Sequence, residues 1–167
     1  MALPGPRPRY VPQPAKAVEV ILWLAEHWSG IDVYHLVKAV YFADRRHITE
    51  YGRPIIGDDY GAAPFGPLPQ VVYGLLRHDP IEVLAASSNG RLPFHVTDAF
   101  AVIPDREPNL RLLSESDQSA LAFGLSKVRG KSFAELCDLT HEDAAFRNAD
   151  GGRMDYRDFI AEDDPDR

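Results

Sequence analysis

The sequence predicts an α+β fold: a mostly α-helical single domain with a small antiparallel β-hairpin or sheet inserted between N-terminal and C-terminal helices. Apolar residues recur at helical spacing over residues 15–51 and again over residues 116–129. Between these parts, residues 81–103 form short runs rich in β-branched and aromatic residues, separated by a Ser-Asn-Gly turn signal. This change from helical spacing of apolar residues to strand-like runs predicts a sheet in the middle of the chain.

Length and composition place the chain in a broad class. Its 167 residues are enough for one domain with a buried core. The single cysteine, Cys137, cannot form an internal disulfide, and the longest apolar run, residues 20–25, is far too short to span a bilayer. We therefore expect a soluble, cytoplasmic protein with no membrane partner.

The charge is unevenly distributed. Of the formal net charge of −7, residues 1–137 carry 14 Lys/Arg against 15 Asp/Glu, whereas residues 138–167 carry 4 against 10. A nearly neutral globular part without a basic stripe predicts no nucleic-acid partner, because such binding depends on neutralising phosphates. We divide the chain into a disordered proline-rich arm (1–14), one domain (15–150) and an acidic tail (151–167).

The N-terminal part predicts two helices. Residues 15–28 are apolar on nearly every face, which indicates a buried first helix. Ser29 and Gly30 end it, and Asp32 is placed to cap a longer helix that runs to about Tyr51.

A stretch rich in proline and glycine follows at residues 61–69. Its composition rules out a helix or a central strand, so we expect a rigid, non-repetitive bend with Phe65 as an aromatic anchor. A short helix is predicted over residues 71–77 and ends at Asp79-Pro80. Residues 81–85 and 92–96 are then predicted to pair as a hairpin, with 99–103 as a further strand.

Three capping-box patterns organise the C-terminal part: they begin at Ser114, Ser132 and Thr140. They predict helices over residues 116–129, 133–139 and 141–148. Gly151-Gly152 ends the last helix, and residues 153–167 are expected to be a fraying turn followed by a disordered end.

Four segments, taken in order and spacing, resemble the Panacea domain, also called the antitoxin SocA-like domain. They are residues 37–44 (VKAVYFAD), 51–58 (YGRPIIGD), 63–73 (APFGPLPQVVY) and 139–143 (LTHED). The resemblance covers roughly residues 16–148. It implies a helical domain with a small sheet that acts as the antitoxin of a type II toxin–antitoxin system and neutralises a cognate protein toxin, encoded by an adjacent gene, by direct binding. In one branch of the family the domain delivers its toxin to a protease, and a proteolytic adaptor is therefore the alternative.

The candidate toxin-binding residues lie in or near the proline- and glycine-rich stretch at residues 61–69 and the other segments that carry the resemblance. The rigid bend at residues 61–69 would present side chains to a partner at little entropic cost, although the Phe65 side chain could equally point inward. The acidic residues 58 and 59 could pair with arginines of a basic toxin or form a solvated loop. Residues 140–143 fit a helix cap better than a catalytic group, and Tyr34, Tyr41 and Tyr73 fit core packing. The candidates are Asp58, Asp59, Tyr60, Phe65, Gly66, Pro67, Tyr73, Tyr41 and His141.

An enzymatic function is not expected. The sequence contains no phosphate-binding loop, nucleophile elbow, dinucleotide fingerprint or zinc-spaced Cys/His set, and we expect no cofactor. A small metal-dependent hydrolase built on Asp44, His47 and Asp58, with Glu50 on the same helical face, is the remaining alternative. Cys137 is expected to be buried and inert.

Overall fold

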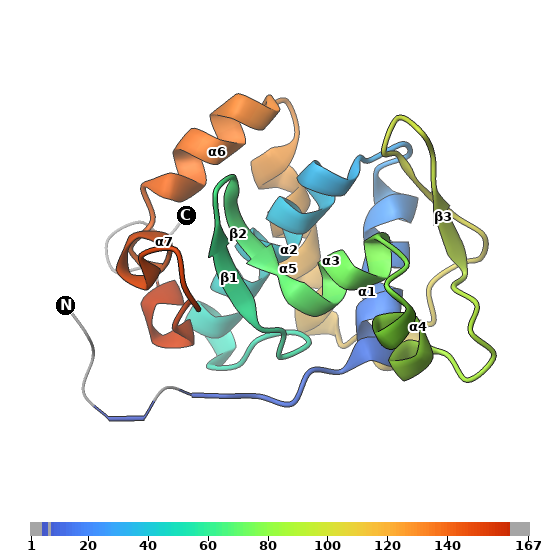
Figure 1. The fold of residues 1–167 in the computed structure, drawn as a ribbon, viewed down its shortest axis with the longest axis horizontal. Helices are drawn as coiled ribbons and strands as arrows, with labels where there is room; N and C mark the ends of the chain where they lie inside the picture. The colour runs from blue at the N-terminus through green and yellow to red at the C-terminus, as the bar shows by residue number, and fades with distance from the viewer. Residues whose placement is uncertain (1–4, 7, 161–167) are drawn as a thin grey trace.

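The structure is a computed structural model that describes residues 5–6 and 8–160. It confirms a mostly helical α+β domain, with α2 and α5 crossing at its centre and two separate antiparallel hairpins (Figure 1). The helices are α1 (Pro14–His27), α2 (Val33–Tyr51), α3 (Gln70–Leu76), α4 (Pro80–Ala86), α5 (Glu115–Val128), α6 (Phe133–His141) and α7 (Ala144–Ala149); the 3-10 turns are η1 (Leu110–Leu112) and η2 (Tyr156–Phe159); the strands are β1 (Tyr60–Ala63), β2 (Gly66–Pro69), β3 (Phe94–Val96) and β4 (Val102–Pro104).

The first two helices form as the sequence predicts. Every residue of α1 from Ala17 to Ala25 is buried, which agrees with its apolar character on all faces. The Asp32 carboxylate accepts a hydrogen bond from the His35 N–H at 2.9 Å and so caps α2, and Gly52 ends that helix in the left-handed conformation. Helices α1 and α2 both pack against α5 to form the core. The contact between α2 and α5 is the most extensive between any two elements.

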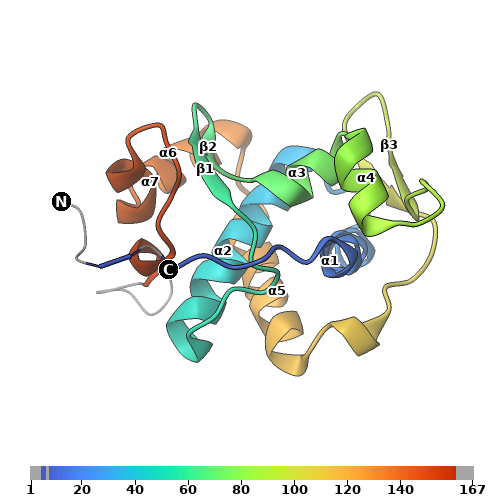
Figure 2. The same ribbon diagram turned by 60° about the horizontal axis from the view of Figure 1, so that its bottom comes forward.

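The stretch at residues 60–69 is a regular β-hairpin, so the predicted non-repetitive bend is wrong. β1 and β2 pair antiparallel from Tyr60↔Pro69 to Ala63↔Gly66. Proline is tolerated here because, among the described residues, β2 pairs only with β1 and is not a central strand. The hairpin packs against α2, α3 and α6 (Figures 1 and 2).

The predicted strand at residues 81–85 is also wrong, because these residues form α4. The Asp79 carboxylate accepts from the Ile81 N–H, and Pro80 occupies the first helical position. The dipeptide Asp79-Pro80 therefore starts a helix in addition to ending one. The second hairpin consists of β3 and β4, which fall within the predicted runs 92–96 and, in part, 99–103.

Two of the three predicted capping boxes are confirmed, at Ser114 before α5 and at Ser132 before α6. The third is wrong: the Thr140 hydroxyl lies inside α6 and donates to the Leu136 carbonyl at 2.9 Å. Asp143 occupies the N-cap position of α7, but its carboxylate accepts from Tyr41 and Arg45 instead.

The segment after α7 is part of the core, contrary to the predicted fraying. Tyr156 and Phe159 are buried, and their rings contact those of Tyr60 and Tyr41. On the outer side, the Tyr10 ring packs edge-on against Tyr156 at 5.4 Å. Residues 1–4 and 7 of the predicted arm and residues 161–167 of the predicted tail lie outside the described residues.

Across the described part of the chain, no helix combines the length and the apolar character that crossing a bilayer requires.

Candidate functional site

Four exposed aromatic side chains meet in one continuous row, which we call the aromatic ridge: Phe65, Phe133, Tyr34 and Phe100. Successive ring centroids are 5.4, 5.1 and 6.2 Å apart, and the side chains are 37–59% exposed. They come from the β1–β2 tip, the start of α6, the start of α2 and the β3–β4 loop, segments that lie along the upper edge of Figure 1. Contiguous exposed aromatic surface of this kind is typical of protein-binding sites.

A groove of about 410 Å³ continues the ridge between the start of α2, the end of α3 and the β3–β4 hairpin. Tyr34 and Phe100 belong to both the ridge and the groove. Tyr73 and Arg77 form its α3 side, where the guanidinium lies 5.4 Å from the centroid of the tyrosine ring. Val33, Leu76, Val96, Thr97 and Asp98 complete the lining. Ridge and groove together offer flat aromatic contacts and one apolar recess.

The backbone of Phe100 is held in an uncommon conformation that exposes its ring. Its φ is +65°, in the left-handed region that bulky residues rarely adopt. Hydrogen bonds on both sides hold it there: its N–H donates to the Thr97 carbonyl, and its carbonyl accepts from the Val33 N–H, both at 2.9 Å. A strained residue fixed in this way is more common at functional sites than elsewhere.

The tip that carries Phe65 rests on polar side chains from α2 and α6. The Lys38 ammonium donates to the Pro67 carbonyl at 3.0 Å, and the Cys137 thiol contacts the Phe65 carbonyl at 3.4 Å. Gly66 has φ +115°, and a Cβ there would come within 2.6 Å of the Thr140 hydroxyl and 2.8 Å of the Lys38 nitrogen. The tip is therefore fixed, and only glycine fits at its closest approach.

Lys38 differs in its partners from Arg45, the other buried cation among the described residues. The Lys38 side chain is 3% exposed, and within the described residues no carboxylate pairs with it. Burial lowers its pKa from 10.5 to about 8, with the nearby Cys137 acting in the opposite direction. Glu19, Arg45 and Asp117, by contrast, each have a partner of opposite charge. The protein thus keeps a buried cation beneath the ridge at a cost in stability.

Replacing Lys38 by methionine is expected to stabilise the protein at pH 7. The lowering of the Lys38 pKa from 10.5 to about 8 means that burying the charged side chain costs about 3 kcal/mol of stability. The methionine variant avoids this cost but loses the hydrogen bond to the Pro67 carbonyl, which stabilises the wild type by about 1 kcal/mol. The expected net gain in stability is therefore about 2 kcal/mol. Between pH 8 and 10.5 the unfolded state binds more protons than the native state, so wild-type stability rises with pH and the gain shrinks.

Urea denaturation of wild type and Lys38→Met at pH 7 and pH 10 measures this effect. Lys127→Met, at a half-buried lysine on α5, is the matched control and should change little. A Lys38→Met variant that is less stable than wild type at pH 7 would contradict the assigned cost of the buried charge.

The structure places five of the nine candidate residues inside the fold, and three of these have polar side chains. The Asp58 carboxylate is fully buried and accepts from the Val71 and Val72 N–H groups at 2.8 and 3.0 Å, so it is neither a surface charge nor part of a solvated loop. Burial raises its pKa to about 7, although these N–H groups favour the ionised form. Tyr60 donates to Asp44 at 2.5 Å, and Tyr41 donates to Asp143 at 2.8 Å. Asp58 anchors α3 and Tyr60 anchors the hairpin from within, whereas Tyr41 connects α2 to the start of α7.

The remaining candidates divide between the ridge and other places. Phe65 forms the hairpin end of the ridge, whereas its neighbours Gly66 and Pro67 are buried. Tyr73 lines the groove. Asp59 lies at the base of the hairpin and pairs with Arg153. His141 lies at the far end of α6 from Phe133, where its ring stacks on Phe146 at 4.4 Å. The structure does not bring Asp59 or His141 to the ridge.

Sequence reasoning missed three of the four ridge residues. Tyr34 was expected in the core, but its side chain is 40% exposed. Phe133 and Phe100 were not singled out, and Cys137 is half-buried at the tip instead of buried. The capping box at Ser132 was the one local signal, since it places Phe133 in the first turn of α6.

The proposed metal ligands Asp44, His47 and Asp58 are engaged with other groups. Asp44 accepts from the Ile55 N–H and from Tyr60, and the two His47 nitrogens contact the Arg53 carbonyl and the Ser116 hydroxyl. In the described ranges 5–6 and 8–160, no group of three His, Cys, Asp or Glu side chains has the geometry to hold a metal ion.

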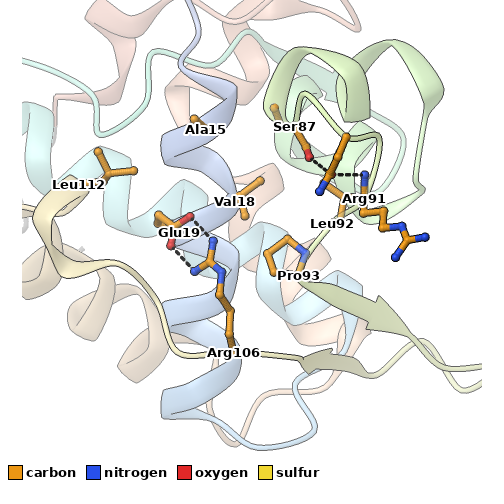
Figure 3. A pocket seen from close by; sticks show the side chains of 11 residues that line it. Ala15, Val18, Glu19, Ser87, Arg91, Leu92, Pro93, Arg106 and Leu112 are labelled. Carbon is orange, nitrogen blue, oxygen red and sulfur yellow. Dashed lines mark hydrogen bonds and ion pairs between the residues drawn. The ribbon is translucent and has the colours of Figure 1, made fainter.

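A second hollow, of about 370 Å³, lies over α1 between the α4–β3 connection and η1 (Figure 3). Its central charges already satisfy each other: Arg106 donates to both oxygens of Glu19 at 2.8 and 3.0 Å, and the Asn109 N–H donates to the same carboxylate. Arg91 points away from this pair (Figure 3). The hollow is explained by these structural contacts.

The chain matches a protein family. Residues 36–146 match the family described as antitoxin SocA-like, Panacea domain, which is more than half of the chain and includes Phe65, Phe100 and Phe133 of the ridge. No curated protein and no solved structure matches the chain.

Proposed function

Because the chain belongs to the antitoxin SocA-like, Panacea domain family, we propose that it is the antitoxin of a type II toxin–antitoxin system and neutralises a protein toxin by binding it through the aromatic ridge and groove. The toxin is the product of an adjacent gene, and the complex forms in the cytoplasm. The antitoxin performs no chemistry of its own; it covers the toxin's active site or holds the toxin in an inactive shape.

The observation that carries this proposal is the ridge. Four aromatic side chains from distant parts of the chain gather on one surface, where each remains more than a third exposed. Aromatic residues dominate binding energy at protein interfaces, because they bury a large area and lose little conformational entropy. A monomer gains nothing from leaving them exposed.

The rigidity of this surface supports the same function. The hairpin tip under Phe65 is held by contacts with Lys38, Thr140 and Cys137. Two backbone hydrogen bonds hold Phe100. A surface that is ordered before it meets its partner loses little entropy on binding, which favours a tight stoichiometric complex.

The test is bacterial growth with the adjacent open reading frame induced, with and without this chain, followed by a pull-down of this chain from the surviving cells. Rescue of growth with the intact toxin in the pull-down is the expected result. Rescue with loss of the toxin would indicate delivery to a protease instead. A harmless neighbour that does not co-purify would overturn the antitoxin function.

A further inference from the structure

The register of the second hairpin leaves one strand edge unpaired. Thr97 donates to the Ala101 carbonyl and Asp105 to the Pro93 carbonyl, so residues 93, 95 and 97 of this hairpin point their backbone groups toward β4. The backbone groups of Phe94 and Val96 consequently point to the opposite side, the outer edge of β3.

The corresponding edge of β4 is already occupied. Its Val102 N–H donates to the Ile31 carbonyl at 2.8 Å, and Asp32 and Ala101 form a β-bridge next to it. On the outer edge of β3, by contrast, no residue within the described part of the chain forms a backbone hydrogen bond with Phe94 or Val96. The small sheet thus has one satisfied edge and one open edge.

The open edge adjoins the groove. Val96 is half-buried and lines the groove, together with Thr97 and Asp98. In a sheet, residues directly opposite each other on neighbouring strands point to the same face. A residue that paired with Val96 from an added strand would therefore project its side chain to the groove side, toward Tyr73 and Leu76.

We propose that the partner docks by adding an extended segment to the outer edge of β3, with an apolar side chain opposite Val96 inserted into the groove. This inference rests on the proposed function, and it names the form of the toxin segment that the antitoxin recognises. Backbone hydrogen bonds to Val96 provide the pairing, and the apolar recess selects the side chain. The neighbouring ridge then contacts the body of the same partner.

A substitution of Val96 separates backbone pairing from side-chain packing. Val96→Pro removes the outward N–H and leaves the β3–β4 ladder intact, because that N–H does not take part in it. Val96→Thr keeps the N–H and a side chain of similar shape. We expect Val96→Pro to bind the toxin about 10-fold or more weakly than Val96→Thr, because only the threonine variant keeps the backbone donor.

Hydrogen exchange measured by NMR supplies the control for folding and a direct readout. In the free protein, the Val96 amide should exchange faster than those of His95 and Thr97, and in the complex it should become protected. The His95 and Thr97 amides should stay protected in Val96→Pro. Equal affinity of wild type and Val96→Pro, or a Val96 amide that stays fast in the complex, would overturn the edge pairing and leave the antitoxin function standing.

The edge can also be tested without the toxin. A random peptide library is selected on wild type and counter-selected on Val96→Pro. Peptides that bind wild type, lose binding to Val96→Pro and protect the Val96 amide would support the pairing even where the neighbouring gene product fails to bind. A library that yields only peptides indifferent to Val96→Pro would overturn it.

Discussion

Truncation of Tyr34 and Phe133 together to alanine should lower the affinity for the toxin by about 100-fold or more, since each central aromatic anchor of an interface contributes about 2 kcal/mol or more. These two rings form the middle of the ridge, with Phe65 and Phe100 at its ends. The fold should tolerate the change because both side chains are more than a third exposed. Titration calorimetry measures the affinity, and thermal unfolding checks the fold.

The matched control removes exposed apolar surface elsewhere. Ile81→Ala combined with Leu110→Ala truncates side chains that are 78% and 54% exposed on α4 and η1. This control should bind the toxin like wild type. A Tyr34/Phe133 double variant that retains full affinity, beside a control that loses it, would place the interface on the α4 and η1 side of the molecule.

Local sequence signals predicted the elements whose geometry they determine directly. Asp32, Ser114 and Ser132 each cap a helix through a bond to an N–H group three residues away, so the pattern and its consequence lie within one turn. Helix α4 was missed because Ile81 and Val83 favour a strand by propensity, and the cap at Asp79-Pro80 outweighs that preference.

The site was harder to predict because no segment contains it. Phe65 was identified from its rigid surroundings, but Tyr34, Phe100 and Phe133 come together only through the packing of α2, α6 and the β3–β4 loop. Phe100 also depends on a left-handed backbone conformation that its residue type disfavours. The same limit applies to Lys38, whose burial beneath the hairpin tip is a tertiary property of a lysine on an otherwise apolar helical face.

Gly124→Ala should destabilise the protein by about 3 kcal/mol, although helix propensity alone favours alanine by about 1 kcal/mol. A Cβ at this position would lie 2.2 Å from the Ala39 carbonyl oxygen and 3.2 Å from the Ala43 Cβ, at the closest approach of α5 to α2. Neither contact can be relieved by rotating a flexible side chain, so the two helices must separate.

Urea denaturation tests whether Gly124→Ala lowers or raises the free energy of unfolding. Ser119→Ala, on the exposed face of the same helix, should leave stability unchanged or raise it slightly. A Gly124→Ala variant as stable as wild type would mean that α2 and α5 can move apart without loss. Because α2 carries Tyr34 and Lys38, and the hairpin tip rests on Lys38, such a movement would displace the ridge. Gly124→Ala should therefore also weaken toxin binding in whatever fraction remains folded, whereas Ser119→Ala should not.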